Sequence, residues 1–269
     1  MQNYFRNMNK LIFLVIAILL FTISCSEYEK LLKSDNTELK YEKAFEYYED
    51  EKYVKASTLM QYLKPIYRGT DKASKIDFYY AKSLFGQRDY LLAGYHFDEF
   101  AKNYGLSPYA EEADFLKAYC YYLLSPRPNL DQANSMQAIG AFNLFLIKYP
   151  DSKRREECIK YIEELSNKLV KKAYLSAKLY YDLGYYRASI IALNNCLSEF
   201  TESAYREELK FLLLKSNYLY AQKSIQNKMK ERYQDTIDEY YSFVEEFPES
   251  EFLSEAQKMY NEANKVLNN

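Results

Sequence analysis

Apolar side chains recur along the chain in one pattern, which appears five times. An aromatic residue is followed three positions later by a small residue, and large apolar residues stand 4, 7 and 11 positions beyond the small one. One copy consists of Tyr90, Ala93, Phe97, Phe100 and Tyr104. Spacings of three and four residues place side chains on one face of an α-helix. The pattern therefore predicts five amphipathic helices, each of which lets a neighbouring helix approach closely at its small residue.

A second helical run precedes each copy and is joined to it by a short polar turn. The five runs cover residues 38–50, 72–86, 108–124, 152–182 and 203–224. A polar turn followed by an aromatic residue and then a small one resembles the tetratricopeptide repeat, in which two antiparallel helices form one unit. The last run, Glu251 to Leu267, has no partner and is predicted to cap the end of the stack.

These runs predict an all-α fold over residues 38–269, an α-solenoid of about five tetratricopeptide-like helix pairs with a C-terminal capping helix. The small residues expected at the helix contacts are Ala56, Ala93, Ala138, Ser189 and Thr236. In the third copy, Ser135 takes the place of the aromatic residue. A generic helical bundle is the alternative, because amphipathic helices alone would give the same apolar spacing, although not the recurrent turn.

The N-terminal segment has the features of a secretion signal. Arg6 and Lys10 precede an apolar run of 13 residues, Leu11 to Ile23. This run is shorter than the ~20 apolar residues that a spanning helix needs and has the length of a signal-peptide core. Either Met1 or Met8 could be the start, since the sequence from Met8 is a complete signal by itself.

A cysteine that follows a small residue directly after this run resembles a bacterial lipobox. We therefore expect cleavage before Cys25, which would then carry the lipid. Residues 1–24 are assigned to a lipoprotein signal peptide and residues 25–37 to a lipidated linker. Ser26, where Asp would signal inner-membrane retention, resembles an outer-membrane address. The alternative is an uncleaved membrane anchor with an incidental cysteine.

Composition excludes several classes of protein. With 6 Gly and 6 Pro, the chain lacks the turn residues that β-sandwiches and barrels require. A net charge of -2 gives no electrostatic preference for nucleic acid. Cys120, Cys158 and Cys196 fall among apolar helical positions and are expected to be buried free thiols, although the sequence leaves a bridge between two of them open.

Signs of catalysis are missing from the sequence. The chain contains neither a phosphate-binding glycine loop nor a nucleophile elbow nor a pair of cysteines separated by two residues. His96 is the one histidine and lies outside any zinc-protease motif, so it is expected to be a surface or groove residue. We therefore predict a non-enzymatic binding protein without a cofactor or a metal.

Tyrosines on the first helices are the candidates for a binding surface, because stacked hairpins form a groove lined mostly by those helices. We expect about half of them to belong to the core, and the rest to suit an extended or aromatic-rich peptide. The candidate peptide-binding residues are Tyr47, Tyr48, Tyr79, Tyr80, Tyr119, Tyr121 and Tyr122. Tyr180 and Tyr181, in the fourth pair, are candidates for contact with a partner protein.

Together, the lipobox, the helix pairs and the recurring closure such as Tyr149-Pro-Asp-Ser152 resemble the BamD family, the lipoprotein subunits of the outer-membrane β-barrel assembly machinery. The resemblance extends from Cys25 to the C-terminal helix. It implies a scaffold at the periplasmic face of the cell outer membrane, held there by lipid on Cys25. It also implies that the chain binds a BamA-type barrel protein, other assembly subunits and unfolded outer-membrane proteins, whose C-terminal strand ends in an aromatic residue.

Other helical lipoproteins remain as alternatives. The nearest is a periplasmic tetratricopeptide lipoprotein that coordinates cell-envelope synthesis. A glycan-capturing lipoprotein of the SusD type is less similar, since glycan sites favour Trp and the chain has none. A lytic transglycosylase would need an appended catalytic domain, for which the repeats leave no residues.

Overall fold

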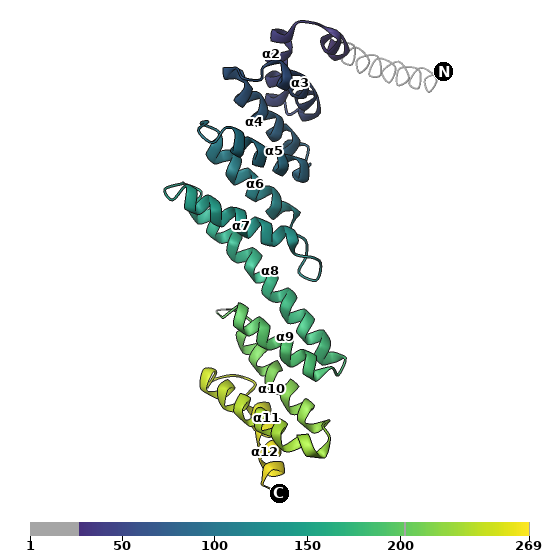
Figure 1. Cartoon of the computed structure of the whole chain (residues 1–269), viewed down its shortest axis with the longest axis vertical. Coiled ribbons are helices and arrows are strands. Elements are labelled where there is room, and N and C mark those ends of the chain that lie inside the picture. Colours follow the sequence, from purple (N-terminus) through teal and green to yellow (C-terminus); the bar gives the residue numbers. More distant parts are fainter. Residues whose placement is uncertain (1–26, 202, 269) are drawn as a thin grey trace, which may run out of the picture. The chain divides into compact units, whose positions relative to one another are not determined.

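Antiparallel helices joined by short turns make up the described chain (Figure 1). The computed structural model describes residues 27–201 and 203–268. These residues form two compact units, one ending at Leu123 and the other beginning at Leu124. No strand occurs among the described residues, so the predicted all-α tetratricopeptide-type fold is confirmed.

The N-terminal unit holds two complete hairpins and one further helix. In chain order its helices are α2 (Thr37–Glu49), α3 (Tyr53–Ile66), α4 (Asp71–Gly86), α5 (Tyr90–Asn103) and α6 (Ala110–Leu124). A short helical stretch over residues 27–33 precedes α2. Helix α3 packs against both α2 and α4, and α4 packs against α5.

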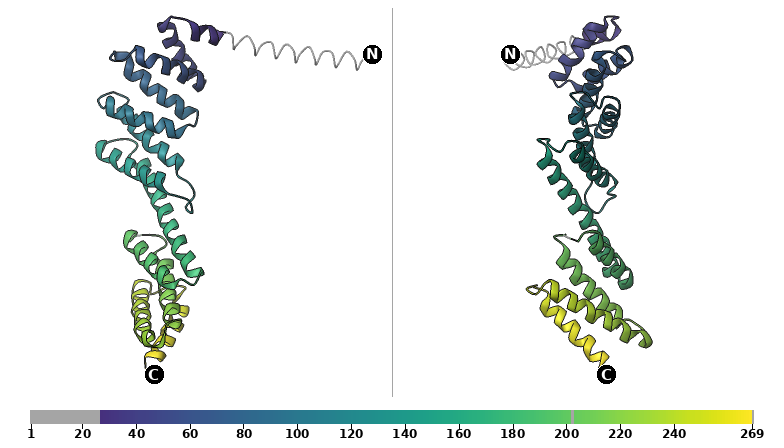
Figure 2. Two further views of the ribbon diagram at one scale, coloured as in Figure 1. Left: turned by 45° about the vertical axis from the view of Figure 1, so that its right-hand side comes forward. Right: turned by 60° about the vertical axis from the view of Figure 1, so that its left-hand side comes forward.

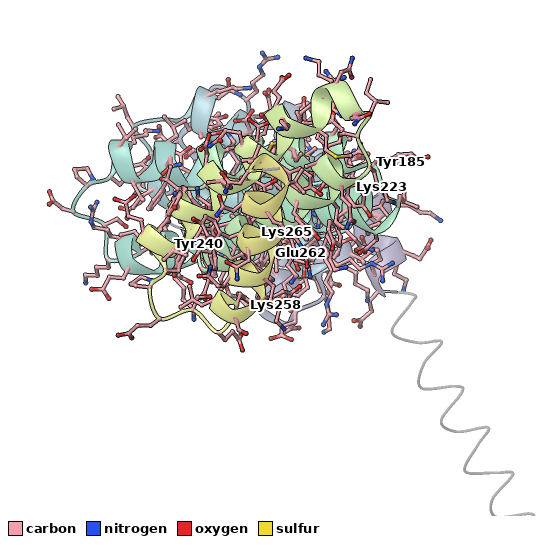
Figure 3. All side chains as sticks on the ribbon, turned by 90° about the horizontal axis from the view of Figure 1, so that it is seen from below. Tyr185, Lys223, Tyr240, Lys258, Glu262 and Lys265 are labelled. Atoms are coloured by element: carbon pink, nitrogen blue, oxygen red, sulfur yellow. The ribbon has the colours of Figure 1, made fainter. Side chains whose placement is uncertain are left out.

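The C-terminal unit also consists of antiparallel helices and ends in a single helix without a following partner among the described residues. Its helices are α7 (Ala133–Lys148), α8 (Arg155–Asp182), α9 (Tyr186–Glu199), α10 (Arg206–Gln222), α11 (Gln226–Glu246) and α12 (Leu253–Leu267). Helix α12 runs alongside α11 (Figure 2) and buries Ala256, Met259 and Ala263. Its Lys258 and Lys265 are exposed to solvent (Figure 3), whereas Glu262 accepts a hydrogen bond from Tyr218 of α10. Helix α12 is therefore the capping helix that the sequence predicted.

Helix contacts depend on the small residues. Ala56, Ala93, Ala138, Ser189 and Thr236 are all fully buried. The hydroxyl of Ser189 donates a 3.0 Å hydrogen bond to the carbonyl oxygen of Ala177, so α9 meets α8 directly at its small residue. The register predicted from the repeat is therefore confirmed.

Three of the hairpin turns share one backbone geometry. The middle residue of each turn has a left-handed φ: 59° at Glu51, 63° at Arg88 and 78° at Gly184. In the first of these turns, the amide of Lys52 donates to the carbonyl of Tyr47 at 2.8 Å, and the amide of Glu51 donates to Tyr48 at 3.0 Å. This pair of bonds is the Schellman motif that ends many helices. The left-handed residue and the two backbone hydrogen bonds therefore account for the tight turn that the sequence predicted here.

The second helices do not all begin at their aromatic residue. Helices α3, α5 and α9 begin at Tyr53, Tyr90 and Tyr186, but α11 begins at Gln226, seven residues before Tyr233. The added turns pack Met229 against the cluster that contains Ala221 and Tyr233, and this contact stabilises the longer helix.

Candidate functional site

The N-terminal unit carries a continuous set of aromatic contacts, which we call the aromatic face, formed by Tyr41, Phe45, Tyr48, Tyr79 and Tyr109. Ring centres lie 4.9 Å apart for Tyr41 and Phe45, and 5.2 Å apart for Phe45 and Tyr79. The ring of Tyr79 also meets Tyr48 edge-on at 4.8 Å and Tyr109 at 6.1 Å. These residues come from α2, α4 and the segment before α6, so the face crosses successive first helices.

Lysine ammonium groups lie over the aromatic face. Lys72 is 4.4 Å from the centre of the Tyr41 ring, and Lys75 is 4.4 Å from that of Phe45. Lys82 is 5.7 Å from the Tyr79 ring and forms a 3.0 Å ion pair with Glu112. Cations in such positions are attracted to the ring faces. Lys72 is also ion-paired with Glu38 at 2.7 Å, so the face combines apolar rings with charged groups of both signs.

Burial and charge perturb the titration of this surface. Burial raises the pKa of both Tyr48 and Tyr79, although nearby Lys82 opposes the shift. Burial would lower the pKa of Lys82, but its hydrogen bond to Glu112 and the proximity of Tyr48 outweigh this, and its pKa is raised. At neutral pH the surface therefore presents phenol hydroxyls and a protonated ammonium group.

Adjacent tyrosines of the predicted site point to different surroundings, because neighbouring residues on a helix are about 100° apart. Tyr79 joins the aromatic face, whereas Tyr80 is only 7% exposed and packs 4.8 Å from the ring of His96. Tyr48 joins the aromatic face, whereas Tyr47 lies 5.6 Å from Tyr28. The structure brings Tyr48 and Tyr79 together and separates them from Tyr47 and Tyr80.

The remaining predicted tyrosines lie further along the chain. Tyr119 stacks on Tyr122 at 5.6 Å and is 6.1 Å from Phe85 of α4. Tyr121 is half-buried. In the C-terminal unit, Tyr180 is 42% exposed, and Tyr181 is half-buried with its ring 5.7 Å from Tyr186.

Sequence reasoning missed part of the aromatic face. Tyr41 and Phe45 were not among the candidates, although Tyr41, Phe45 and Tyr48 are spaced four and three residues apart on α2. That spacing was the available signal. Tyr109 and the three lysines had no comparable signal, because their place depends on how the hairpins pack.

His96 belongs to a polar cavity of about 460 Å³ on the other side of α4. Its lining includes Lys64, Asp77, Glu99 and Tyr104. Burial, and then Lys64, lower the pKa of His96. Among the described residues, no group of three or more His, Cys, Asp and Glu side chains is arranged to hold a metal ion.

The predicted lipid attachment at Cys25 lies outside the described residues. Within the described part of the chain, none of the helices combines the length and the apolar character that crossing a membrane requires. Cys120, Cys158 and Cys196 are buried free thiols, as the sequence predicted.

Comparison with known proteins identifies relatives of the chain. The family model described as "YfiO: Outer membrane lipoprotein" matches residues 33–232. The chain is 27% identical over 194 residues to the putative outer membrane protein assembly factor BamD of Aquifex aeolicus (strain VF5), covering 72% of this chain and 61% of that protein. It is 29% identical over 84 residues to the outer membrane protein assembly factor BamD of Helicobacter pylori (strain ATCC 700392 / 26695), covering 31% of this chain and 36% of that protein. The chain thus spans less than two thirds of either relative.

Among solved structures, the chain is similar to the TPR domain of P58(IPK). The TM-score is 0.42 at 14% sequence identity, and the match covers 89% of this chain and 68% of that one. A second similar structure is the human IFIT1 dimer with PPP-AAAA, with a TM-score of 0.30, 21% identity, and coverage of 82% and 55%.

Proposed function

The chain belongs to the YfiO family of outer membrane lipoproteins, and from this we propose that it is an assembly factor for outer membrane proteins. It acts as a scaffold and not as an enzyme. It binds a BamA-type barrel protein and unfolded barrel substrates, and lipid on Cys25 holds it at the periplasmic face of the outer membrane.

The observation that carries the substrate role is the aromatic face with its lysines. Aromatic rings offer apolar contact area at a small cost in side-chain entropy, which favours extended segments rich in aromatic residues. A strand that ends in an aromatic residue and a free carboxylate would place its ring beside Tyr48 and Tyr79 and its carboxylate near Lys75. Phe45, whose ring is 4.4 Å from the Lys75 ammonium, would lie between the two contacts.

Affinity purification tests the scaffold role. The tagged full-length protein is recovered from detergent-solubilised outer membrane, and its companions are identified by mass spectrometry. Stoichiometric recovery of a large barrel protein with periplasmic repeat domains supports the proposal. Recovery of cell-wall synthases would instead support the rival, a lipoprotein that coordinates cell-envelope synthesis.

Peptide binding tests the aromatic face separately. The probe is a labelled peptide that ends in Phe with a free carboxylate, and its amidated form is the comparison. Lys75→Glu and Tyr48→Ala should weaken binding about tenfold, or about 1.4 kcal/mol. Tyr95→Ala, at an exposed tyrosine of α5, is the matched control and should leave binding unchanged. Equal binding by all variants would exclude this surface.

Fractionation tests the anchor. The Cys25→Ala variant should fold but appear in the soluble periplasmic fraction, because stable membrane attachment of such a protein needs two or more acyl chains. If the variant remained in the membrane fraction, lipid attachment at Cys25 would be wrong.

A further inference from the structure

A recess in the C-terminal unit lies outside the aromatic face. It has a volume of about 510 Å³ and is formed where α8 turns into α9 and meets the end of α10. Its principal lining residues are Tyr185, Tyr186, Arg187, Ile191, Tyr220 and Lys223. Tyr185 is 62% exposed and Ile191 is 54% exposed, so large apolar side chains are open to solvent here.

The α8–α9 turn shapes one wall of this recess. Gly184, with a φ of 78°, ends α8 and directs Tyr185 and Tyr186 to the cavity. A Cβ atom at Gly184 would be 3.9 Å from the Lys223 ammonium, which shows that the two sides meet closely. Tyr185 and Lys223 are labelled in Figure 3 at the edge of the unit. The backbone of the α8–α9 turn therefore forms one side of the recess, and the Lys223 side chain closes the other.

Charge at the recess has a single sign. Its charged lining residues are Arg187 and Lys223, and no carboxylate is among the described residues that line it. Lys223 lies 4.9 Å from the Tyr186 ring centre, and the Arg232 guanidinium lies 3.9 Å from that of Tyr220. Cations that rest on ring faces keep hydrogen-bond donors available for an incoming carboxylate.

We propose that this recess binds a segment of a partner protein in which a large apolar side chain stands next to carboxylates. The apolar side chain fills the space between Tyr185, Ile191 and Tyr220, and the carboxylates pair with Arg187 and Lys223. Complementary charge at the rim gives specificity, while the buried apolar anchor supplies most of the affinity.

This inference gives a chemistry to the partner contact proposed for the fourth helix pair, and to that extent it rests on the proposed function. Tyr181, one of the two tyrosines assigned to that contact, lies 5.7 Å from Tyr186 in the wall of the recess. The binding of a peptide to the recess can nevertheless be measured without the assembly machinery. The experiments therefore distinguish a failure of the recess proposal from a failure of the scaffold proposal.

The test uses the full mature chain in detergent and a labelled acetylated, amidated peptide, Glu-Glu-Phe-Glu-Glu. Fluorescence anisotropy should show saturable binding, which Lys223→Glu or Ile191→Ser weakens about tenfold. Lys258→Glu reverses an outward charge on α12 of the same unit and should change binding less than about twofold. Both recess variants change exposed side chains, so circular dichroism should be unaltered.

Two further peptides separate the apolar from the ionic contribution. Replacement of Phe by Ala should abolish binding, and replacement of the four Glu by Gln should weaken it and remove its dependence on salt. Absence of binding by the parent peptide, or equal binding by the Gln peptide, would overturn the proposal. Success of the membrane purification together with failure here would leave the scaffold role standing and exclude only this recess.

Discussion

The ammonium group of Lys40 lies 3.8 Å from the centre of the Tyr62 ring, which joins α2 to α3 through a buried charge. Lys40 is only 2% exposed, and its Nζ also donates a 2.9 Å hydrogen bond to the carbonyl oxygen of Leu32. Lys40 therefore links the helical stretch before α2 to the first hairpin, in addition to the contact between the rings of Tyr28 and Tyr47. A buried charge of this kind is tolerated only where its partners are in place.

Replacing Lys40 by Met tests this attachment. The variant should lose about 1–3 kcal/mol in its free energy of unfolding, because the Leu32 carbonyl would lose its donor. The substitution should also increase the rate of amide hydrogen exchange in residues 27–33 more than in α4. Lys43→Met is the control, since the exposed pair of Lys43 with Glu46 contributes little, and that variant should stay within about 0.5 kcal/mol of the wild type. Equal stability of the two variants would contradict the stabilising role given to the buried Lys40 ammonium group.

Two glycines in helices should respond in opposite ways to alanine. At Gly86 a Cβ would lie 2.6 Å from ring atoms of Tyr53, so Gly86→Ala should destabilise the protein by about 1–3 kcal/mol. At Gly140 nothing lies within 4 Å of the Cβ position, so Gly140→Ala should stabilise it by up to about 1 kcal/mol. Urea denaturation measures both. A stabilised Gly86→Ala variant would show that the Tyr53 ring moves away from the new methyl group at little cost in free energy.

The repeat was readable from sequence because its helix contacts use local spacing. Ala56, Ala93 and Thr236 occupy the same place in the first, second and fifth copies of the repeat, and all three are buried as the spacing predicts. The binding surface was harder to predict from the sequence. The rotation of each helix decides which of two adjacent tyrosines faces a neighbouring helix, and the sequence does not determine that rotation. Tyr79 and Tyr80 have the same chemistry, and only the packed hairpins distinguish them.

Lys40 marks another limit of sequence reasoning. Lysine is almost never fully buried without a partner, so composition and pattern place it on the surface. Its partners, the Leu32 carbonyl and the Tyr62 ring, come from segments that meet only after folding. Tertiary contacts of this kind do not produce a regular spacing of residues, so the sequence pattern does not predict them.

The shared turn geometry predicts a second pair of opposed substitutions. A left-handed φ costs a residue with a Cβ roughly 1 kcal/mol relative to glycine. Arg88→Gly should therefore stabilise the α4–α5 hairpin, and Gly184→Ala should destabilise the α8–α9 hairpin by a similar amount. Thermal unfolding of the two variants beside the wild type decides the matter. Shifts of the same sign in both would argue against the left-handed assignment.

The three described thiols should be unreactive in the folded protein. Burial raises the pKa of Cys120 to about 12 and those of Cys158 and Cys196 to about 11. Since the thiolate is the reactive form, an aromatic disulfide reagent at about pH 8 should label none of them until denaturant is added. The Cys25→Ala variant removes the remaining cysteine from the measurement. Rapid labelling of the native variant would mean that at least one of these sites opens readily.

Tyr104 makes a pH-dependent contribution to stability. Its hydroxyl donates a 2.8 Å hydrogen bond to Asp77, and burial together with this carboxylate raises the pKa of Tyr104 to about 12. An unfolded tyrosine has a pKa of about 10. Because the folded state holds the proton more tightly, the contribution is complete below about pH 10 and is lost as the pH rises toward 12.

Comparison of the wild type with Tyr104→Phe isolates this contribution from those of the other tyrosines. The difference in unfolding free energy between the two proteins should be constant from pH 7 to 9 and should shrink between about pH 10 and 12. Asp77→Asn removes the charge but keeps the side-chain shape, so in that background the decline should still begin at about pH 10 but should be smaller and should end at a lower pH. A difference that stays constant up to pH 12 would mean that Tyr104 titrates alike in the folded and unfolded states, and the Asp77 contact would then have no part in the alkaline stability of the N-terminal unit.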